Sequence, residues 1–266
     1  MVKQGKKVSV MFDTAILIIT YNRPDLCIEL IEDLHKNGYN NIWVTIDGPK
    51  HIEDKLKQKE IQEYMDTAML PTSKKNKFGI NYGCRDGVIN GITWFFKNNK
   101  EGIVIEDDVR IDKAYIENMG RLLKVNEKDK SIFSISSHYD YTVIKENYTV
   151  KEEMIMRSPL CRVWGWATWA DRWDRHLNYL ETDKMQSKLG IFLGLPKTIR
   201  TKELSLRIFA CKYGHMKAWD YEWNLTHVKK KAYSLTPNKM YSVNKGFRAD
   251  GTHTINGAPP WDILEK

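Results

Sequence analysis

The feature that most constrains this chain is a short apolar segment that runs directly into three acidic residues, at positions 103–109 (IVIEDDV). Consecutive β-branched residues are typical of a strand buried on both faces. Side chains alternate along an extended chain, so Glu106 and Asp108 are predicted to point to one side and Asp107 to the other. Three carboxylates beside an apolar strand are costly without a compensating cation. That cation is either an Arg or Lys side chain or a hard ion such as Mn²⁺ or Mg²⁺, and a plain solvated turn is the alternative.

The first half of the chain alternates apolar runs with amphipathic segments. Such alternation predicts an α/β fold with a doubly wound, mostly parallel central sheet flanked by helices. Ligands bind at the carboxyl ends of strands in these sheets, where Asn22, Asp47 and the acidic triplet all fall. The predicted strands are 15–19, 42–46, 103–106 and 131–136. One helix is predicted from Pro24, capped by Asn22 or Arg23, to a stop at Gly38, and a second over 53–66. After a Lys-rich loop, a third helix is predicted from an Asp86 cap, and a fourth begins at Asp112.

The second half is rich in aromatic residues. Six of the nine tryptophans lie between positions 164 and 223, and most of them are expected in the core. Gly165 and Ala167 separate Trp164, Trp166 and Trp169, and such small residues allow flat rings to approach one another, as in sugar-stacking clefts. Helices are predicted over 201–211 and from Trp219, and a strand over 232–235, before a loop-like tail.

The charge and cysteine content restrict the partners and the compartment. The net charge of +8 favours acidic partners such as phosphates, nucleotides or an anionic membrane face, but the lysines are scattered and indicate no nucleic-acid site. The four cysteines have no C-x-x-C or histidine spacing for zinc and are typical of a reducing compartment. No signal peptide and no run of ~20 apolar residues is found. The predicted location is cytoplasmic, with peripheral contact at the inner membrane face.

Seven stretches, taken in order, carry a resemblance to a known family. They are ILIITYNRP, IDGP, the segment 79–91 with Arg85, VIEDDV, WGWATW, WDYEW and GFRADGTHT. From Ala15 to about Thr254 the chain resembles nucleotide-sugar glycosyltransferases of the GT-A fold. The likeness is to inverting enzymes around N-acetylglucosaminyltransferase I and to bacterial surface-polysaccharide transferases. It implies a single GT-A domain over 1–266, with a nucleotide-sugar-binding half at about 12–137 and an aromatic-rich acceptor-binding half at about 138–266.

The resemblance also implies a donor site for a nucleoside-diphosphate sugar, with UDP-sugars favoured. The alternatives are a plain Asp-Gly turn at Asp47, a surface arginine at Arg85 and an exposed loop histidine at His253. The implied roles are base and ribose binding by Thr20, Asn22, Arg23 and Asp47, diphosphate binding by Arg85, contact with the ribose and sugar by Glu106 and Asp107, and Mn²⁺ or Mg²⁺ binding by Asp108 and His253.

The resemblance implies a catalytic base in the WDYEW stretch, at Asp220, with Glu222 as the alternative. In a regular helix these two residues are rotated by about 200° from each other, so only one of them faces the acceptor. Acidic residues near a helix N-terminus are favourable in any case, which is the alternative explanation for both. The implied reaction is inverting transfer of a sugar to a hydroxyl of a glycan or lipid-linked acceptor, in the synthesis of surface polysaccharide or glycoconjugates.

Two other functions compete with the transferase. A sugar nucleotidyltransferase needs a glycine-rich loop after its first strand so that backbone amides can approach a triphosphate, and residues 20–24 contain no glycine. A non-catalytic carbohydrate-binding protein could use the tryptophans, but it has no need for the acidic triplet at a strand end.

Overall fold

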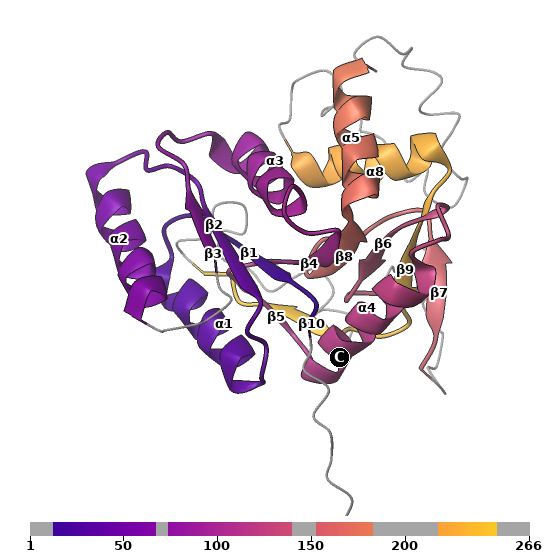
Figure 1. The fold of residues 1–266 in the computed structure, drawn as a ribbon, viewed down its shortest axis with the longest axis horizontal. Coiled ribbons are helices and arrows are strands. Elements are labelled where there is room, and N and C mark those ends of the chain that lie inside the picture. Colours follow the sequence, from indigo (N-terminus) through magenta and orange to yellow (C-terminus); the bar gives the residue numbers. More distant parts are fainter. Residues whose placement is uncertain (1–12, 68–73, 140–152, 183–217, 249–266) are drawn as a thin grey trace, which may run out of the picture.

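The computed structural model describes residues 13–67, 74–139, 153–182 and 218–248, which form a sheet with helices on both faces (Figure 1). The strands are β1 (Ile16–Thr20), β2 (Ile42–Ile46), β3 (Lys74–Lys77), β4 (Glu101–Glu106), β5 (Val109–Ile111), β6 (Ile132–Ser136), β7 (Ile155–Ser158), β8 (Trp166–Trp169), β9 (Tyr233–Pro237) and β10 (Ser242–Asn244). The helices are α1 (Pro24–Lys36), α2 (Ile52–Thr67), α3 (Gly83–Phe96), α4 (Lys113–Asn126), α5 (Ala170–Thr182) and α8 (Trp219–Lys230).

The sheet confirms the predicted α/β class. In the described part of the chain its strand order is β3-β2-β1-β4-β8-β6-β9-β7, and β5 pairs separately with β10. Strands β3, β2, β1 and β4 are parallel neighbours, as right-handed crossovers through helices require. Strand β8 enters antiparallel between β4 and β6, and β7 is antiparallel at the far edge. Strands from both halves therefore share one sheet, while the proposed division at about 137 stays a prediction.

The central strands are buried on both faces, which explains their continuous apolar sequences. Ile103 and Ile105 pack with residues of α1 and α4 on one face. Val104 between them packs on the other face, in a cluster that includes α3, α5 and α8. Glu106 continues the alternation of Val104, so the last residue of β4 is directed to the side of α3 and α8.

Several predicted boundaries are confirmed, and two predictions are wrong. Helix α1 begins at Pro24 and ends at Lys36, before Gly38 with its positive φ of 89°. Asp112 caps α4 by accepting from the Tyr115 amide at 3.2 Å. The Lys-rich loop contains edge strand β3, because its backbone pairs with β2. Helix α3 begins at Gly83, so Asp86 lies in its first turn and is not its cap.

Two of the three predicted sugar-stacking rings are part of the core, and the third, Trp164, is partly buried against it. Trp166 and Trp169 are 1% and 2% exposed, because residues 166–169 form strand β8 in the middle of the sheet. Trp166 packs against Trp173, Trp219 and Trp223. Burial of this aromatic cluster holds α5 and α8 on the sheet, so the tryptophans of β8 stabilise the fold and present no ring to a sugar.

Two fully buried histidines form polar contacts around α8. His227 Nδ1 lies 2.9 Å from the Trp223 carbonyl, which only accepts, so His227 Nε2 accepts from Ser134 Oγ at 2.8 Å. His176 Nδ1 lies 2.7 Å from Thr226 Oγ1. Burial lowers the pKa of His227 to about 4 and that of His176 to about 3. Both rings are therefore neutral in the folded protein at pH 7.

We expect the two buried histidines to lower the free energy of unfolding as the pH falls from about 6.5 toward 4, against an opposite contribution from Glu106 and Asp107, whose pKa values are raised. In this window the unfolded chain protonates both histidines and the folded chain does not, so each costs up to about 1.4 kcal/mol per pH unit. Urea denaturation at several pH values measures this slope. The slope of the free energy of unfolding against pH should be smaller in His227→Asn than in wild type, by up to about 1.4 kcal/mol per pH unit. Equal slopes in wild type and His227→Asn would contradict the assignment.

The predicted helix over 201–211 and the tail with His253 lie outside the described residues. Within the described ranges, every helix is too short or too polar to span a bilayer.

Candidate active site

Two of the three acidic residues after β4 converge on one arginine. Asp107 is 1% exposed, and its Oδ2 accepts from Thr20 Oγ1 at 2.7 Å while its Oδ1 pairs with Arg23. The other guanidinium nitrogen, Arg23 Nη1, lies 2.9 Å from Asp108 Oδ2. The predicted alternation is therefore wrong for Asp108, because the chain turns at residues 107–108 instead of remaining extended. Arg23 therefore supplies a cation that compensates the carboxylates of Asp107 and Asp108, which is one of the alternatives predicted from the sequence.

The carboxylates interact strongly even with Arg23 present. Burial raises the pKa of Asp107 to about 6, although the charge of Arg23 opposes this shift. Burial also raises the pKa of Glu106 to about 8, and repulsion by Asp108, Asp107 and Asp220 adds to the shift. Glu106 is therefore largely protonated at neutral pH in this structure, and a further cation at this edge of the sheet would favour its ionised form.

Asp220 on α8 acts electrostatically on the same group of carboxylates. It lies in the first turn of α8, and its charge acts on Glu106 at the end of β4 and on Cys84 at the start of α3. Asn224 donates to the Asp220 carbonyl at 2.9 Å and to the Cys161 carbonyl at 3.1 Å, and so ties this turn to the segment before β8. The acidic groups of the site therefore come from both β4 and α8.

Asp108 has the properties of a metal ligand. Its Oδ1 is buried and has no hydrogen-bond partner among the described residues. An unpartnered carboxylate oxygen suits a hard divalent cation. Within the same ranges, no three His, Cys, Asp or Glu residues are grouped to hold a metal ion, so most ligands of a cation here would come from a bound diphosphate and water. With diphosphate and water supplying most of the ligands, the residues present fit Mn²⁺ or Mg²⁺.

A segment near residue 246 packs directly on Asp108. Strand β10 pairs with β5, and the Lys245 amide donates to the Asp108 carbonyl at 2.7 Å. A Cβ on Gly246 would lie 2.2 Å from Asp108 Oδ2. Lys245 and Arg248 also pair with Glu29 and Asp25 of α1. Only glycine leaves room for the carboxylate at this position.

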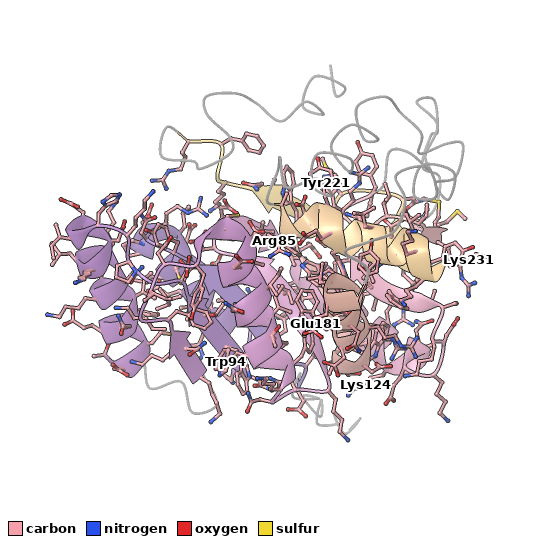
Figure 2. All side chains as sticks on the ribbon, turned by 90° about the horizontal axis from the view of Figure 1, so that it is seen from above. Arg85, Trp94, Lys124, Glu181, Tyr221 and Lys231 are labelled. Carbon is pink, nitrogen blue, oxygen red and sulfur yellow. The ribbon has the colours of Figure 1, made fainter. Side chains whose placement is uncertain are left out.

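Arg85, on α3, lies beside α8 (Figure 2). Its Nε donates to Glu222 Oε2 at 2.8 Å and Oε1 at 3.1 Å, and its Nη1 pairs with Asp86. No described residue accepts from Nη2, which leaves that edge of the guanidinium for an anionic ligand. Burial raises the pKa of Glu222, and the charge of Arg85 opposes that rise. Glu222 is thus half of an ion pair between α8 and α3.

Asp47, at the end of β2, holds the start of α3. Its Oδ1 accepts from the amides of Gly48 at 2.8 Å and Tyr82 at 2.9 Å. Its Oδ2 accepts from the Gly83 amide at 2.9 Å and from Asn81 Nδ2 at 3.2 Å. Two donors on each oxygen fill the usual capacity of a carboxylate. Asp47 therefore caps α3 from outside the helix, and its predicted contact with base or ribose stays a prediction.

Asp54 was not predicted from the sequence. The sequence predicts only a helix over 53–66, yet Asp54 is 5% exposed and Gln58 is fully buried. Asp54 Oδ2 accepts from Tyr21 Oη at 2.7 Å, and its Oδ1 accepts from Asn22 Nδ2 at 2.7 Å. It also accepts from the His51 amide, as an acidic residue in the third position of a helix often does. The place of Asp54 in the third position of the helix is the one feature of the sequence that could have indicated its role.

The structure thus brings together most of the predicted site residues in two groups. Thr20, Arg23, Asp107 and Asp108 form one, and Arg85 with Glu222 forms the other, while Glu106 and Asp220 interact through their charges. His253 lies outside the described residues.

Comparisons with known proteins identify no family for this chain. No protein-family model matches it, and no curated protein does either.

The solved structures that are similar to it include two at low identity. A mannosyltransferase from Pyrobaculum calidifontis in complex with GDP-Man and Mn²⁺ has 12% identity and a TM-score of 0.45, over 63% of this chain and 46% of that chain. The match therefore spans less than half of the mannosyltransferase. A protein assigned as a glucose-1-phosphate thymidylyltransferase from Bacillus anthracis, in complex with sucrose, has 11% identity and a TM-score of 0.45, over 90% and 91% of the two chains. Neither match establishes a family or an activity for this chain.

Proposed function

We propose that this protein is a metal-dependent, inverting glycosyltransferase. It moves a sugar from a nucleoside-diphosphate sugar to a hydroxyl of a glycan or lipid-linked acceptor. One observation carries the proposal: Glu106, Asp107 and Asp108 gather with Arg23 at the end of β4, and the charge of Asp220 on α8 acts on Glu106. Carboxylates that flank a reacting centre on two sides provide one group for the leaving side and one for proton removal.

The leaving side lies at Asp108 and Arg23, and Arg85, held by Glu222, would reach the diphosphate from the side of α8. A divalent cation bound through Asp108 Oδ1 would neutralise the diphosphate as it departs. Arg85 would add hydrogen bonds to the diphosphate through its remaining Nη2 edge, and Arg23 orients the carboxylates. Glu106 would line the sugar from the α3 and α8 side, and Thr20 and Asp107 the ribose.

The acceptor side lies at α8. Asp220 takes the proton from the acceptor hydroxyl as its oxygen forms a bond to the anomeric carbon. The bond from that carbon to the diphosphate oxygen breaks, and its electron pair leaves with the nucleoside diphosphate. Attack from the face opposite the leaving group inverts the anomeric centre. Glu222 is already engaged by Arg85 at 2.8 Å, which favours Asp220 as the base.

A donor screen tests this proposal. The protein is incubated with Mn²⁺ and a panel of UDP-, GDP-, CDP- and ADP-sugars, and release of nucleoside diphosphate is measured with and without EDTA. The proposal requires release from at least one donor and its loss on chelation. Turnover that survives exhaustive chelation would contradict the metal dependence, and binding of free glycans without any effect of nucleotide sugars would favour a carbohydrate-binding protein.

The contact between Gly246 and Asp108 allows a second test. In Gly246→Ala the new methyl group must displace the Asp108 carboxylate, and misplacement by about 1 Å costs roughly 10²-fold in turnover. Steady-state kinetics at saturating Mn²⁺ measure this loss. Gly79→Ala is the matched control, because a Cβ at Gly79 meets nothing within 4 Å. Equal activity in the two variants would remove Asp108 from the reacting centre.

A further inference from the structure

We infer that Asp54 fixes Asn22 as a hydrogen-bond acceptor that reads the base of the nucleotide donor. The site would then take bases with a central ring N–H, namely uracil, thymine and guanine. It would discriminate against cytosine and adenine, whose corresponding ring nitrogen is an acceptor. The inference rests on the proposed function and names the class of its donor substrate.

The orientation of the Asn22 amide follows from its partner. Asp54 Oδ1 lies 2.7 Å from the Asn22 side chain. Hydrogen bonds from Tyr21, Asn22 and two backbone amides lower the pKa of Asp54 to about 2 against the effect of burial, so its carboxylate only accepts. The Asn22 atom that faces it must therefore be the amide nitrogen. The carbonyl oxygen of Asn22 points the other way, and no described residue donates to it.

This orientation is held rigidly. Asp54 is 5% exposed, and its other oxygen accepts from Tyr21 Oη at 2.7 Å and from the amides of Lys50 and His51 at 3.1 and 2.8 Å. Turning the Asn22 amide would bring two oxygens together at a buried carboxylate, which is strongly unfavourable. Asn22 is thus preorganised as an acceptor before any ligand arrives.

The position of Asn22 fits the base end of a nucleotide. In the strand order β2-β1-β4, the acidic residues that face the diphosphate follow β4. Asn22 follows β1, and its partner Asp54 lies on α2, which follows β2. A nucleotide with its diphosphate at β4 therefore extends its base along the edge toward β2, about two strand spacings or ~10 Å away. Asp47 at the end of β2 is saturated by α3, which leaves Asn22 as the acceptor there.

Calorimetric titration with free nucleoside diphosphates in the presence of Mn²⁺ tests the inference. The probes are UDP, GDP, CDP, ADP and N3-methyl-UDP, which lacks the ring N–H. Wild type should prefer UDP or GDP over CDP and ADP, and the N3-methyl group should weaken UDP binding, each by roughly tenfold. Asn22→Ala should bind UDP and CDP about equally. Asp54→Asn should lose the preference or reverse it, because its new amide allows Asn22 to turn.

Tyr21→Phe is the matched control, since it removes a different Asp54 contact and leaves the Asn22 contact in place; its UDP-to-CDP ratio should equal that of wild type. A wild-type preference for CDP or ADP, or an unchanged ratio in Asn22→Ala, would overturn the inference and leave the transferase proposal standing. Wild-type protein that binds none of the nucleoside diphosphates would overturn both. Asn22→Ala leaves α2 intact, so it decides the matter even where Asp54→Asn fails to fold.

Discussion

Asp220→Asn should lower the turnover number by ~10²–10⁴-fold while donor and metal binding stay near wild type. An amide cannot take the proton from the acceptor hydroxyl, but it keeps the shape of the carboxylate and its place in the first turn of α8. Steady-state kinetics with acceptor, together with calorimetric titration of the donor, separate these effects. If Asp220 only stabilises the helix terminus, the same change should cost under about 1 kcal/mol of stability and little activity.

Glu222→Gln is the internal control for Asp220. Glu222 forms an ion pair with Arg85, and Gln retains one acceptor for that guanidinium, so we expect less than about a tenfold loss of turnover. Transfer abolished in Glu222→Gln but retained in Asp220→Asn would reverse the assignment, and full activity in both would place the base outside α8.

Asp108→Asn should remove the response of the enzyme to Mn²⁺ and lower turnover by at least ~10²–10³-fold. The buried Oδ1 of Asp108 accepts no hydrogen bond from the described residues, and an amide there cannot balance a cation or the charge of a diphosphate. Titration with Mn²⁺, followed by turnover and by calorimetry, measures both losses.

Asp107→Asn is the informative comparison for Asp108. Asp107 has both oxygens engaged by Thr20 and Arg23, so its change should alter stability and site geometry without abolishing the response to Mn²⁺. An Asp108→Asn enzyme that still responds to Mn²⁺ as wild type does would move the metal to another group.

The α/β class and the strand that ends at the acidic triplet were predictable from local sequence. Residues 103–106 have the β-branched run of a doubly buried strand, and Pro24 and Gly38 mark the limits of α1. The rule that side chains alternate between two faces fails at Asp108, because it applies only while the chain is extended. The local sequence does not indicate a turn at the two acidic residues.

The remaining site contacts depend on residues far apart in the sequence. Arg85 and Glu222 are separated by 137 positions, and neither sequence context indicates the other. Trp166 and Trp169 are of the residue type that stacks on sugars at binding surfaces, but pairing of β8 between β4 and β6 buries them. Asp54 was missed because apolar periodicity identifies only the apolar face of a helix, whereas α2 contacts the β1 and β2 loops through buried polar groups.

The most direct test of the central claim is an NMR assay of the reaction itself. Donor, acceptor and Mn²⁺ are mixed with the protein, and ³¹P and ¹H spectra follow the phosphates and the anomeric proton. The account predicts one nucleoside diphosphate for each glycoside formed, with an anomeric configuration opposite to that of the donor. Retained configuration would contradict the inverting mechanism. Pyrophosphate formed from a nucleoside triphosphate and a sugar 1-phosphate, with no glycoside from the nucleotide sugar, would contradict the transferase altogether.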